Sequence, residues 1–349
     1  MNAITDFLYS VLSGINGVVN NYGVAIIIFT ILMRLVCMPF DYRSRKGMRK
    51  MAVVQPKINE LQKKYQNDPK KLQQKQAELM RKEGYNPLSG CLPLLLTWPL
   101  MIAMFAAMRA IANEHLAMQA FQYLAGESTI ITPAEQFLWV KNIWMTDSPF
   151  TSIAPDARSL QMLTQDVWLK AYDLLNENQL QAITAAIRGV SEQALDFTTR
   201  EAMQTSVQSI LAALENVPAY TAAVAPVAGW SNLNALIFTI TLYQQYNGLL
   251  ILPVAAGVAQ VLQTKYNPQM KEQQNVQPAN GQGQGMSNFM KYFFPILSVY
   301  FCLSSNAGFA LYWVTSTAIM WAQGIVLTKV FEKQEAKKAD TVSGEGSVK

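Results

Sequence analysis

Apolar residues fall in long tracts that carry almost no charge, and four such tracts stand out along the chain. They cover 21–40, where Arg34 is the single charge, and 84–108, 216–264 and 292–328. A helix needs about 20 apolar residues to cross the roughly 30 Å hydrocarbon core of a bilayer. Each tract is therefore long enough to contain a membrane span.

Turn residues decide how many spans each tract holds. Pro, Gly and Asn residues interrupt the first part of the third tract, so we expect one span near its end. The fourth tract is too long for one span, and Asn306-Ala307-Gly308 favours a tight turn in its middle. The pattern predicts an all-α polytopic membrane protein with five transmembrane helices, over 21–40, 88–109, 248–264, 289–305 and 308–328.

The segments between these spans differ in charge, and the difference predicts their side of the membrane. Residues 41–88 include thirteen basic and five acidic side chains, whereas 110–247 include five basic and twelve acidic ones. Lys and Arg are enriched in cytoplasmic loops. We therefore expect 41–87, the linker 265–288 and the tail 329–349 in the cytoplasm, and the N-terminus and 110–247 outside.

The cytoplasmic segment 41–87 has the pattern of a helical hairpin. Apolar residues recur every three or four positions on both sides of Asn67, and Asp68 suits an N-cap with Pro69 in the first turn. Two interpretations stay open: a solvated helix pair that closes on a thin apolar seam, or a basic arm that meets anionic lipid or an acidic or ribosomal partner. The basic residues singled out here are Arg43, Arg45, Lys46, Arg49, Lys50, Lys63, Lys64, Lys70 and Lys71.

Three further segments have compositions that predict their structure. Residues 1–20 place apolar side chains on one helical face, which predicts an amphipathic helix on the outer membrane surface. Residues 155–245 form an extracytoplasmic insertion, whose Ala-, Gln- and Leu-rich part up to 215 predicts two to four helices. Within the linker 265–288, residues 273–288 are flexible by composition, and the polar last dozen residues are typical of a disordered end.

Composition supports the membrane assignment and limits the chemistry. Charged residues make up 15% of the 349 residues, against about 25% in a typical soluble domain. His115 is the single histidine, which excludes chemistry that needs two imidazoles, and the sequence has no GxxxxGK[ST] nucleotide motif. We expect no catalytic residues, no metal and no small-molecule cofactor, and therefore no enzyme.

Arg34 is the one charge inside the four apolar tracts, and it needs an explanation. An Arg at mid-bilayer costs about 2.5–3.5 kcal/mol on insertion scales. With Phe40 as the inner boundary it lies about 9 Å deep, which is at the limit of snorkelling to the head groups. The alternative is a water-filled cavity within the helices. Other polar positions that could line it are Thr30, Thr97, Gln260, Gln263, Ser304, Ser305, Thr315 and Gln323.

Several motifs agree in order and spacing with one known family over about 1–150 and 246–330. They are Thr30-Ile-Leu-Met-Arg34 with Pro39, Gln55-Pro-Lys-Ile58, Asn86-Pro-Leu-Ser-Gly-Cys-Leu-Pro93, Phe137-Leu-Trp-Val140, Asp147-Ser-Pro149, Ile251-Leu-Pro253 with Gly257 and Gln260, and Gly308-Phe-Ala-Leu-Tyr-Trp313 with Gln323. In these residues the chain resembles the YidC/Oxa/Alb-type membrane protein insertases, and its pattern is nearest to the bacterial members.

The resemblance implies an insertase that moves hydrophobic nascent segments and short polar tails into the bilayer through a hydrophilic groove. It places Arg34, Thr30 and Trp313 in that groove, and from the polar positions named above we add Thr97 and Gln260 as further lining residues. It implies nascent membrane proteins and the lipid bilayer as partners, the ribosome and the Sec translocon as further candidates, no DNA, and a multi-pass location in the bacterial plasma membrane.

Two departures and one alternative remain. The insertion after residue 150 and the short Lys-bearing tail depart from the family pattern, which leaves the role of the insertion and ribosome docking open. The alternative function is a transporter or channel. That class predicts paired intramembrane charges or repeated spans, and the sequence contains neither.

Overall fold

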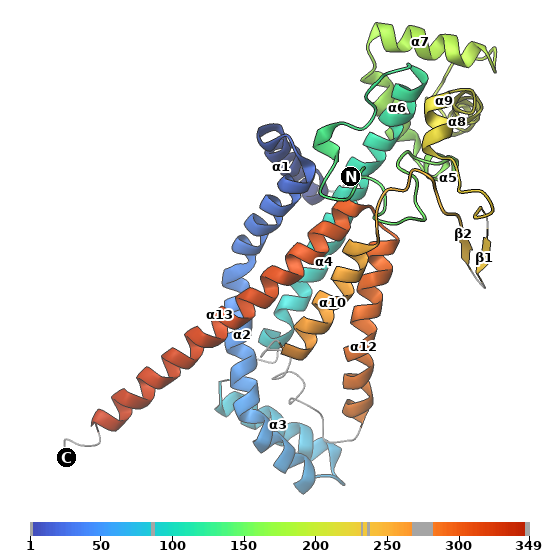
Figure 1. Ribbon diagram of the computed structural model, residues 1–349. Coiled ribbons are helices and arrows are strands. Elements are labelled where there is room, and N and C mark those ends of the chain that lie inside the picture. The colour runs from blue at the N-terminus through green and yellow to red at the C-terminus, as the bar shows by residue number, and fades with distance from the viewer. Residues whose placement is uncertain (1–2, 85–87, 232, 236–237, 267–281, 346–349) are drawn as a thin grey trace. The chain divides into compact units, whose positions relative to one another are not determined.

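The structure is a computed structural model that describes residues 3–84, 88–231, 233–235, 238–266 and 282–345 (Figure 1). Side chains are not described for some helical residues, including 88–98 and 282–291. The described chain is mainly helical, which agrees with the predicted fold class except for one small β-ribbon. That ribbon pairs β1 (Leu233–Ala235) with β2 (Phe238–Ile240) in an antiparallel register.

The N-terminal part of the chain forms four helices, and two of them are longer than their patterns predict. They are α1 (Ala3–Val19), α2 (Tyr22–Lys64), α3 (Pro69–Lys82) and α4 (Leu88–Leu124). The predicted span 21–40 and the first arm of the hairpin are one continuous helix, α2, because the helix-favouring residues around Pro39 and Pro56 continue it despite the lost N–H donors. Helix α4 likewise continues fifteen residues past Arg109.

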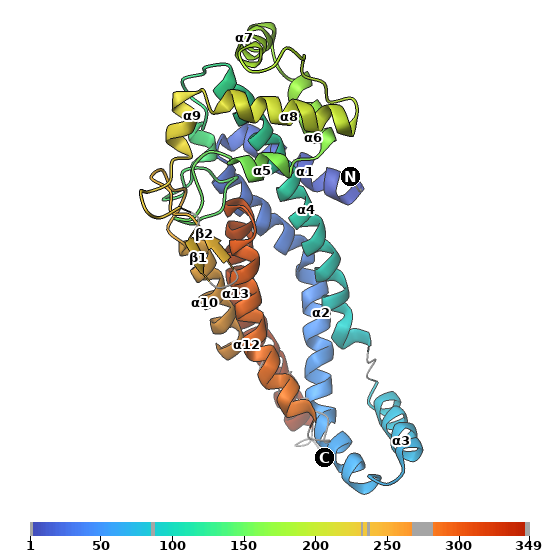
Figure 2. The same ribbon diagram turned by 90° about the vertical axis from the view of Figure 1, so that its right-hand side faces the viewer.

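The insertion folds as a group of short helices. Between residues 155 and 215, where the sequence predicts two to four helices, it contains α5 (Ala157–Gln161), α6 (Gln165–Asp173), α7 (Glu177–Arg188) and α8 (Arg200–Leu214). A further helix, α9 (Pro218–Ala223), precedes the β-ribbon. Helix α8 packs against α5, α6 and α7, and its buried face includes Val207, Ile210 and Leu214 (Figure 2).

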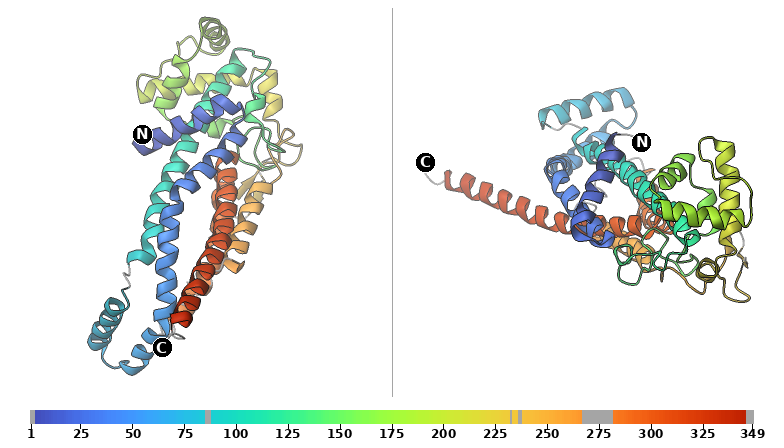
Figure 3. Two further views of the ribbon diagram at one scale, coloured as in Figure 1. Left: turned by 90° about the vertical axis from the view of Figure 1, so that its left-hand side faces the viewer. Right: turned by 90° about the horizontal axis from the view of Figure 1, so that it is seen from above.

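The C-terminal part contains α10 (Ile251–Tyr266), α12 (Gln282–Leu303) and α13 (Ala307–Glu345). Asn306 separates the last two, as the turn chemistry predicts, and its side-chain Oδ1 accepts a hydrogen bond from the Phe309 amide at 2.8 Å. Two boundary predictions are wrong. Residues 282–288 of the predicted linker already belong to α12, and α13 runs unbroken to Glu345 (Figure 3), so most of the predicted disordered end is helical. The rest of the linker, 267–281, lies outside the described residues.

The chain divides into two compact units. Unit 1 consists of Met1–Phe29, Ile102–Val254 and Tyr300–Trp313, and unit 2 consists of Thr30–Met101, Ala255–Val299 and Val314–Lys349. Helices α2, α4, α10, α12 and α13 contribute residues to both. Unit 1 includes the insertion, which packs on α4 through an aromatic cluster of Phe121, Trp168 and Phe197 with centroid distances of 5.5 to 6.2 Å.

Two of the described helices are long and apolar enough to cross a membrane. These are the segments Tyr22–Gly47 of α2 and Ala307–Ala336 of α13. Two shorter apolar segments, Ile4–Val19 and Tyr292–Leu303, fall below that length. Many large apolar side chains on these helices are exposed, among them Leu35, Val36 and Val326. Such side chains are costly in water and favourable in lipid.

Candidate functional site

Arg34 lies on α2 in unit 2 and is held by α13. Its Nε donates a hydrogen bond to Ser316 Oγ at 3.0 Å, and its Nη2 donates to the same oxygen. Two turns further along α13, the Gln323 side-chain amide donates to the Arg34 backbone oxygen at 3.4 Å. Residues seven apart share one face of a helix, so Ser316 and Gln323 meet α2 together.

Arg34 forms no ion pair with the residues of this unit that the structure describes. No carboxylate comes within ion-pairing distance of it among the residues that the structure describes. The nearest acid along its own helix is Asp41, which lies seven residues and about 10 Å further along the axis. A half-buried guanidinium that bonds only to a neutral hydroxyl retains most of its attraction for an added carboxylate.

The other residues predicted for the groove are distributed unevenly. Thr30 is fully buried on α2, one turn before Arg34. Gln260 is half-buried on α10, where its backbone oxygen accepts a bond from the Thr264 hydroxyl at 2.8 Å. Thr97 lies in α4, but its side chain is outside the described part. Trp313 belongs to unit 1, where its ring packs near Phe301 and Phe309.

Ser316 is the residue of this site that sequence reasoning missed. A lone Ser in an apolar helix gives no signal by itself, because its hydroxyl usually bonds to the backbone of its own helix. The available signal was its spacing, since Ser316 lies two turns before Gln323, which the polar pattern did single out. Its exposed fraction is 4%, so its hydroxyl has little access to water.

The predicted basic hairpin is formed by the end of α2 and by α3. Asp68 caps α3 by accepting a bond from the Lys71 amide, with Pro69 in the first turn, as predicted. Lys57 and Glu83 join the two helices through an ion pair of 2.6 Å. No side chain of α3 is fully buried, but its apolar Leu72, Leu79 and Met80 are half-buried, so the interpretation as a helix pair with a thin apolar seam stays open.

Most basic residues of the hairpin are exposed, and two differ. Arg43, Lys46, Lys50, Lys63, Lys64, Lys70 and Lys71 are exposed, whereas Arg45 is buried and Arg49 is half-buried. Arg49 lies over the ring of Phe331 at 5.1 Å and pairs with Glu335 at 3.1 Å, and Phe331 stacks on Tyr42 at 5.0 Å. The far end of α13 therefore packs on the basic arm within unit 2.

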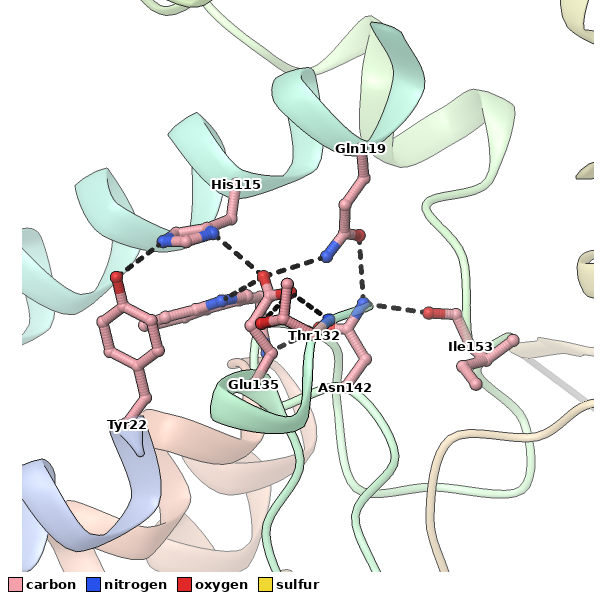
Figure 4. A network of polar contacts seen from close by, with 8 residues as sticks. Tyr22, His115, Gln119, Thr132, Glu135, Asn142 and Ile153 are labelled. Atoms are coloured by element: carbon pink, nitrogen blue, oxygen red, sulfur yellow. Dashed lines mark hydrogen bonds and ion pairs between the residues drawn. The ribbon is translucent and has the colours of Figure 1, made fainter. Parts of the chain in front are cut away.

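Unit 1 contains a second polar cluster, centred on the buried carboxylate of Glu135 (Figure 4). Its Oε1 accepts bonds from His115 Nδ1 at 2.9 Å, Trp144 Nε1 at 3.0 Å and Gln119 Nε2 at 3.2 Å. Its Oε2 accepts bonds from the backbone and hydroxyl of Thr132. Five donors thus surround this one carboxylate.

The electrostatics of Glu135 follow from these contacts. Burial raises the pKa of this carboxyl, but the hydrogen bonds and charge of His115, together with the bonds from Thr132, outweigh burial and lower the pKa below its ordinary value. The other nitrogen of His115 lies 3.1 Å from the Tyr22 hydroxyl at the start of α2. The single histidine therefore links α2, α4 and the turn around Glu135 in a structural network.

The segment that follows Glu135 covers the ends of three helices of unit 1. The fully buried Asp147 accepts bonds from the amides of Leu249 and Leu252, both at 2.7 Å, and so caps α10. The Thr146 hydroxyl donates to the backbone oxygen of Ser305, two residues after the end of α12. The backbone oxygens of Met145 and Ile143 accept hydrogen bonds from the first two amides of α13. We call residues 132–153 the capping loop.

These features define a class: a mainly helical protein with apolar helices of membrane-spanning length, one of which carries a cation that forms no ion pair with the described residues. A sequence profile described as "60Kd inner membrane protein" matches residues 14–213 and 205–335. The match covers most of the chain. The chain therefore belongs to the 60Kd inner membrane protein family, also known as the YidC/Oxa1/Alb3 family.

Curated relatives carry the name membrane protein insertase YidC. The protein of Pelodictyon phaeoclathratiforme is 39% identical over 140 residues, which is 40% of this chain and 21% of the relative. The protein of Clostridium tetani is 35% identical over 150 residues, 42% of this chain and 60% of the relative, and that of Treponema denticola is 38% identical over 109 residues, 31% and 18%. The matched part thus spans about a fifth of the first relative and three fifths of the second.

Proposed function

We propose that the chain is a membrane protein insertase of the bacterial inner membrane, which moves hydrophobic nascent segments and short polar tails into the bilayer. The names of its relatives and its family membership support this activity. The observation that carries the proposal is Arg34, a cation on a helix of membrane-spanning length that bonds to a neutral hydroxyl and to no carboxylate of the described residues.

The mechanism follows from the cost of charge in lipid. A polar tail that crosses hydrocarbon loses its hydration, and each unsatisfied group costs several kcal/mol. A hydrated groove around Arg34, for which the sequence predicts Thr30, Gln260, Thr97 and Trp313 as lining residues, would shorten the dry path. Its positive charge would favour acidic groups on the tail. No covalent step is needed, so we propose a binding and transfer function without a catalytic residue, metal or cofactor.

The proposed topology has five spans and an outside N-terminus. Helix α1 would lie on the outer surface, because Leu8 and Leu12 of its apolar face are buried while the apolar side chains of Ile4 and Phe7 are more than half exposed. The basic arm of α2 and α3 would lie in the cytoplasm, where its exposed Lys and Arg side chains suit anionic lipid or an arriving chain. The ribosome and the Sec translocon are the candidate partners at that side.

Site-specific photocrosslinking tests this function. A photoreactive residue at position 30, 260 or 313 is expected to crosslink to a ribosome-bound nascent membrane protein in vesicles, and one at the exposed Leu174, directly after α6, serves as the control. Absence of crosslinks at all three positions would contradict the groove. Solute or ion flux through the same vesicles without a nascent chain would favour a transporter instead.

A further inference from the structure

The hydrogen bonds of Arg34 involve one particular edge of its guanidinium. This group is planar and has five N–H donors, which form a side edge with Nε and Nη2 and an end edge with Nη1 and Nη2. Ser316 Oγ accepts from both Nε and Nη2 and therefore occupies the side edge. The end edge has no hydrogen-bond partner among the described residues.

We propose that Ser316 is a positioning residue that holds the side edge of Arg34 and directs the free end edge toward a carboxylate of the inserting chain. This inference rests on the proposed function and adds a residue and a geometry to it. A carboxylate can bond to a guanidinium edge through two parallel N–H···O bonds. With the side edge occupied, the end edge remains for that bidentate contact.

The chemistry of Ser316 suits this role better than the obvious alternatives. A carboxylate at position 316 would neutralise Arg34 and remove its attraction for an acidic tail. An apolar residue at position 316 would not hold the guanidinium of Arg34. The flexible Arg34 side chain could then extend toward the lipid head groups and move its charge out of the site. A hydroxyl orients the cation and leaves its charge in place.

Gln323 provides a second, independent observation at the same place. Its Nε2 donates to the Arg34 backbone oxygen, while its Oε1 is buried and has no hydrogen-bond partner among the described residues. A buried unpaired acceptor costs free energy unless a ligand or water supplies a donor. On the face of α13 that meets Arg34, Ser316 thus holds the guanidinium and Gln323 holds the backbone oxygen. The Oε1 atom of Gln323 remains as an acceptor for a donor from an incoming chain.

The test measures the preference for acidic tails in vesicles with the full chain. The probe is a single-span substrate whose short translocated tail has either two Asp or two Asn residues, and the readout is the ratio of their initial insertion rates. Ser316→Ala is expected to lower this Asp-to-Asn ratio about tenfold, the order expected for losing one charge-assisted hydrogen bond, and to leave the Asn substrate unchanged. Ser316→Thr retains the hydroxyl and is expected to retain the ratio.

Matched variants separate positioning from general packing. Ser298 is 1% exposed, and its hydroxyl donates to Phe294 O within its own helix, so Ser298→Ala removes an equally buried hydroxyl and is expected to leave the ratio unchanged. Ser316→Cys retains the volume but replaces the hydroxyl with a weak acceptor, and it is expected to lower the ratio as Ser316→Ala does. This second variant covers the case in which the alanine protein folds poorly.

The Arg34→Ala protein distinguishes failure of this inference from failure of the proposed function. If Arg34→Ala abolishes the preference but Ser316→Ala and Ser316→Cys retain it, Ser316 does not position Arg34 and the insertase function stands. If Arg34→Ala retains the preference, the role of the cation itself is wrong. Adding Ser316→Ala to Arg34→Ala is expected to change nothing further, and a further loss would contradict an action through Arg34.

Discussion

The two units differ in the hydrogen-bond partners that surround their buried or half-buried charges. In unit 1 the carboxylates of Glu135 and Asp147 are almost fully buried, and each is surrounded by hydrogen-bond donors from several segments. In unit 2 the cation of Arg34 is half-buried and shares one neutral hydroxyl. A buried polar network whose hydrogen bonds are all formed stabilises one structure, whereas a buried charge without an ion-pair partner lowers the stability of the folded protein. The networks of unit 1 therefore support the fold, and under the proposed function we expect Arg34 of unit 2 to contact the inserting chain.

Removal of the Asp147 carboxylate is expected to have the largest effect on stability. Asp147→Ala leaves the Leu249 and Leu252 amides and the Trp139 indole N–H without their acceptor. We expect a loss of about 3–5 kcal/mol in the free energy of unfolding, because buried donors then lack partners. Denaturant unfolding of the purified protein in detergent measures it, with exposed Asp166→Ala as the control. A loss below about 1 kcal/mol would show that the cap is dispensable.

Close packing at the same cap offers a check that leaves the carboxylate intact. A Cβ added at Gly248 would overlap the carboxylate and the Cα of Asp147, which are rigidly held. Gly248→Ala is therefore expected to destabilise the protein by about 1–3 kcal/mol through overpacking. Gly14, which has open space around its Cβ position, provides the matched Gly→Ala control.

The second effect in size concerns Glu135 and pH. Its pKa is lowered in the folded protein, so its ionised form contributes stability that is present above its unfolded pKa and is lost as the pH falls through the folded value. We expect stability to fall on acidification below about pH 4.5. Glu135→Gln is expected to cost about 2 kcal/mol at pH 7 and to reduce the acid dependence. Unfolding curves of the unmodified and the Glu135→Gln protein at pH 7 and pH 4 measure this dependence. An equal loss of stability in the two proteins between pH 7 and pH 4 would contradict the prediction.

The third prediction concerns Arg34, whose replacement is not expected to lower the free energy of unfolding. Arg34→Leu removes a charge that costs about 2.5–3.5 kcal/mol at mid-bilayer on insertion scales. It also removes the hydrogen bonds between Arg34 and Ser316. We expect unchanged stability or a gain of about 1 kcal/mol, together with a loss of insertion activity. Unfolding in lipid nanodiscs measures the first and vesicle insertion the second. A clear loss of stability would mean that Arg34 serves the fold.

The smallest effect is expected at the contact between α13 and the basic arm. Glu335 is exposed and its pair with Arg49 is screened, so Glu335→Ala is expected to cost less than about 0.5 kcal/mol. Phe331 is 6% exposed and contacts both Tyr42 and Arg49, so Phe331→Ala is expected to cost more. Proteolysis of the α13 end compares the two variants, and equal rates would contradict this order.

Local patterns predicted much of this fold. The uncharged tracts anticipated apolar segments of α2, α4, α10, α12 and α13, and the Asn306 turn and the Asp68 cap are both present. Helix ends were less predictable. Residues beyond Phe40, Arg109 and Thr328 continue their helices, because charge marks where lipid is unfavourable and does not itself end a helix.

The contacts between distant segments could not be predicted. Asp147 and Leu249 are 102 positions apart, and Arg34 and Ser316 are 282 apart, so no periodicity connects them. The sequence could identify Arg34 because a charge in an apolar tract is conspicuous. It could not identify Ser316, since only the packing of α13 on α2 gives that hydroxyl a cation to hold.

The most direct measurement of the central claim compares Arg34→Ala with Arg34→Lys in vesicles. Lysine retains the positive charge, and alanine removes it. For a single-span substrate with an acidic translocated tail, we expect the lysine protein to retain most insertion and the alanine protein to lose at least about tenfold, while a neutral tail inserts at similar rates with both. Equal insertion of the acidic tail by the alanine and lysine proteins would contradict the account.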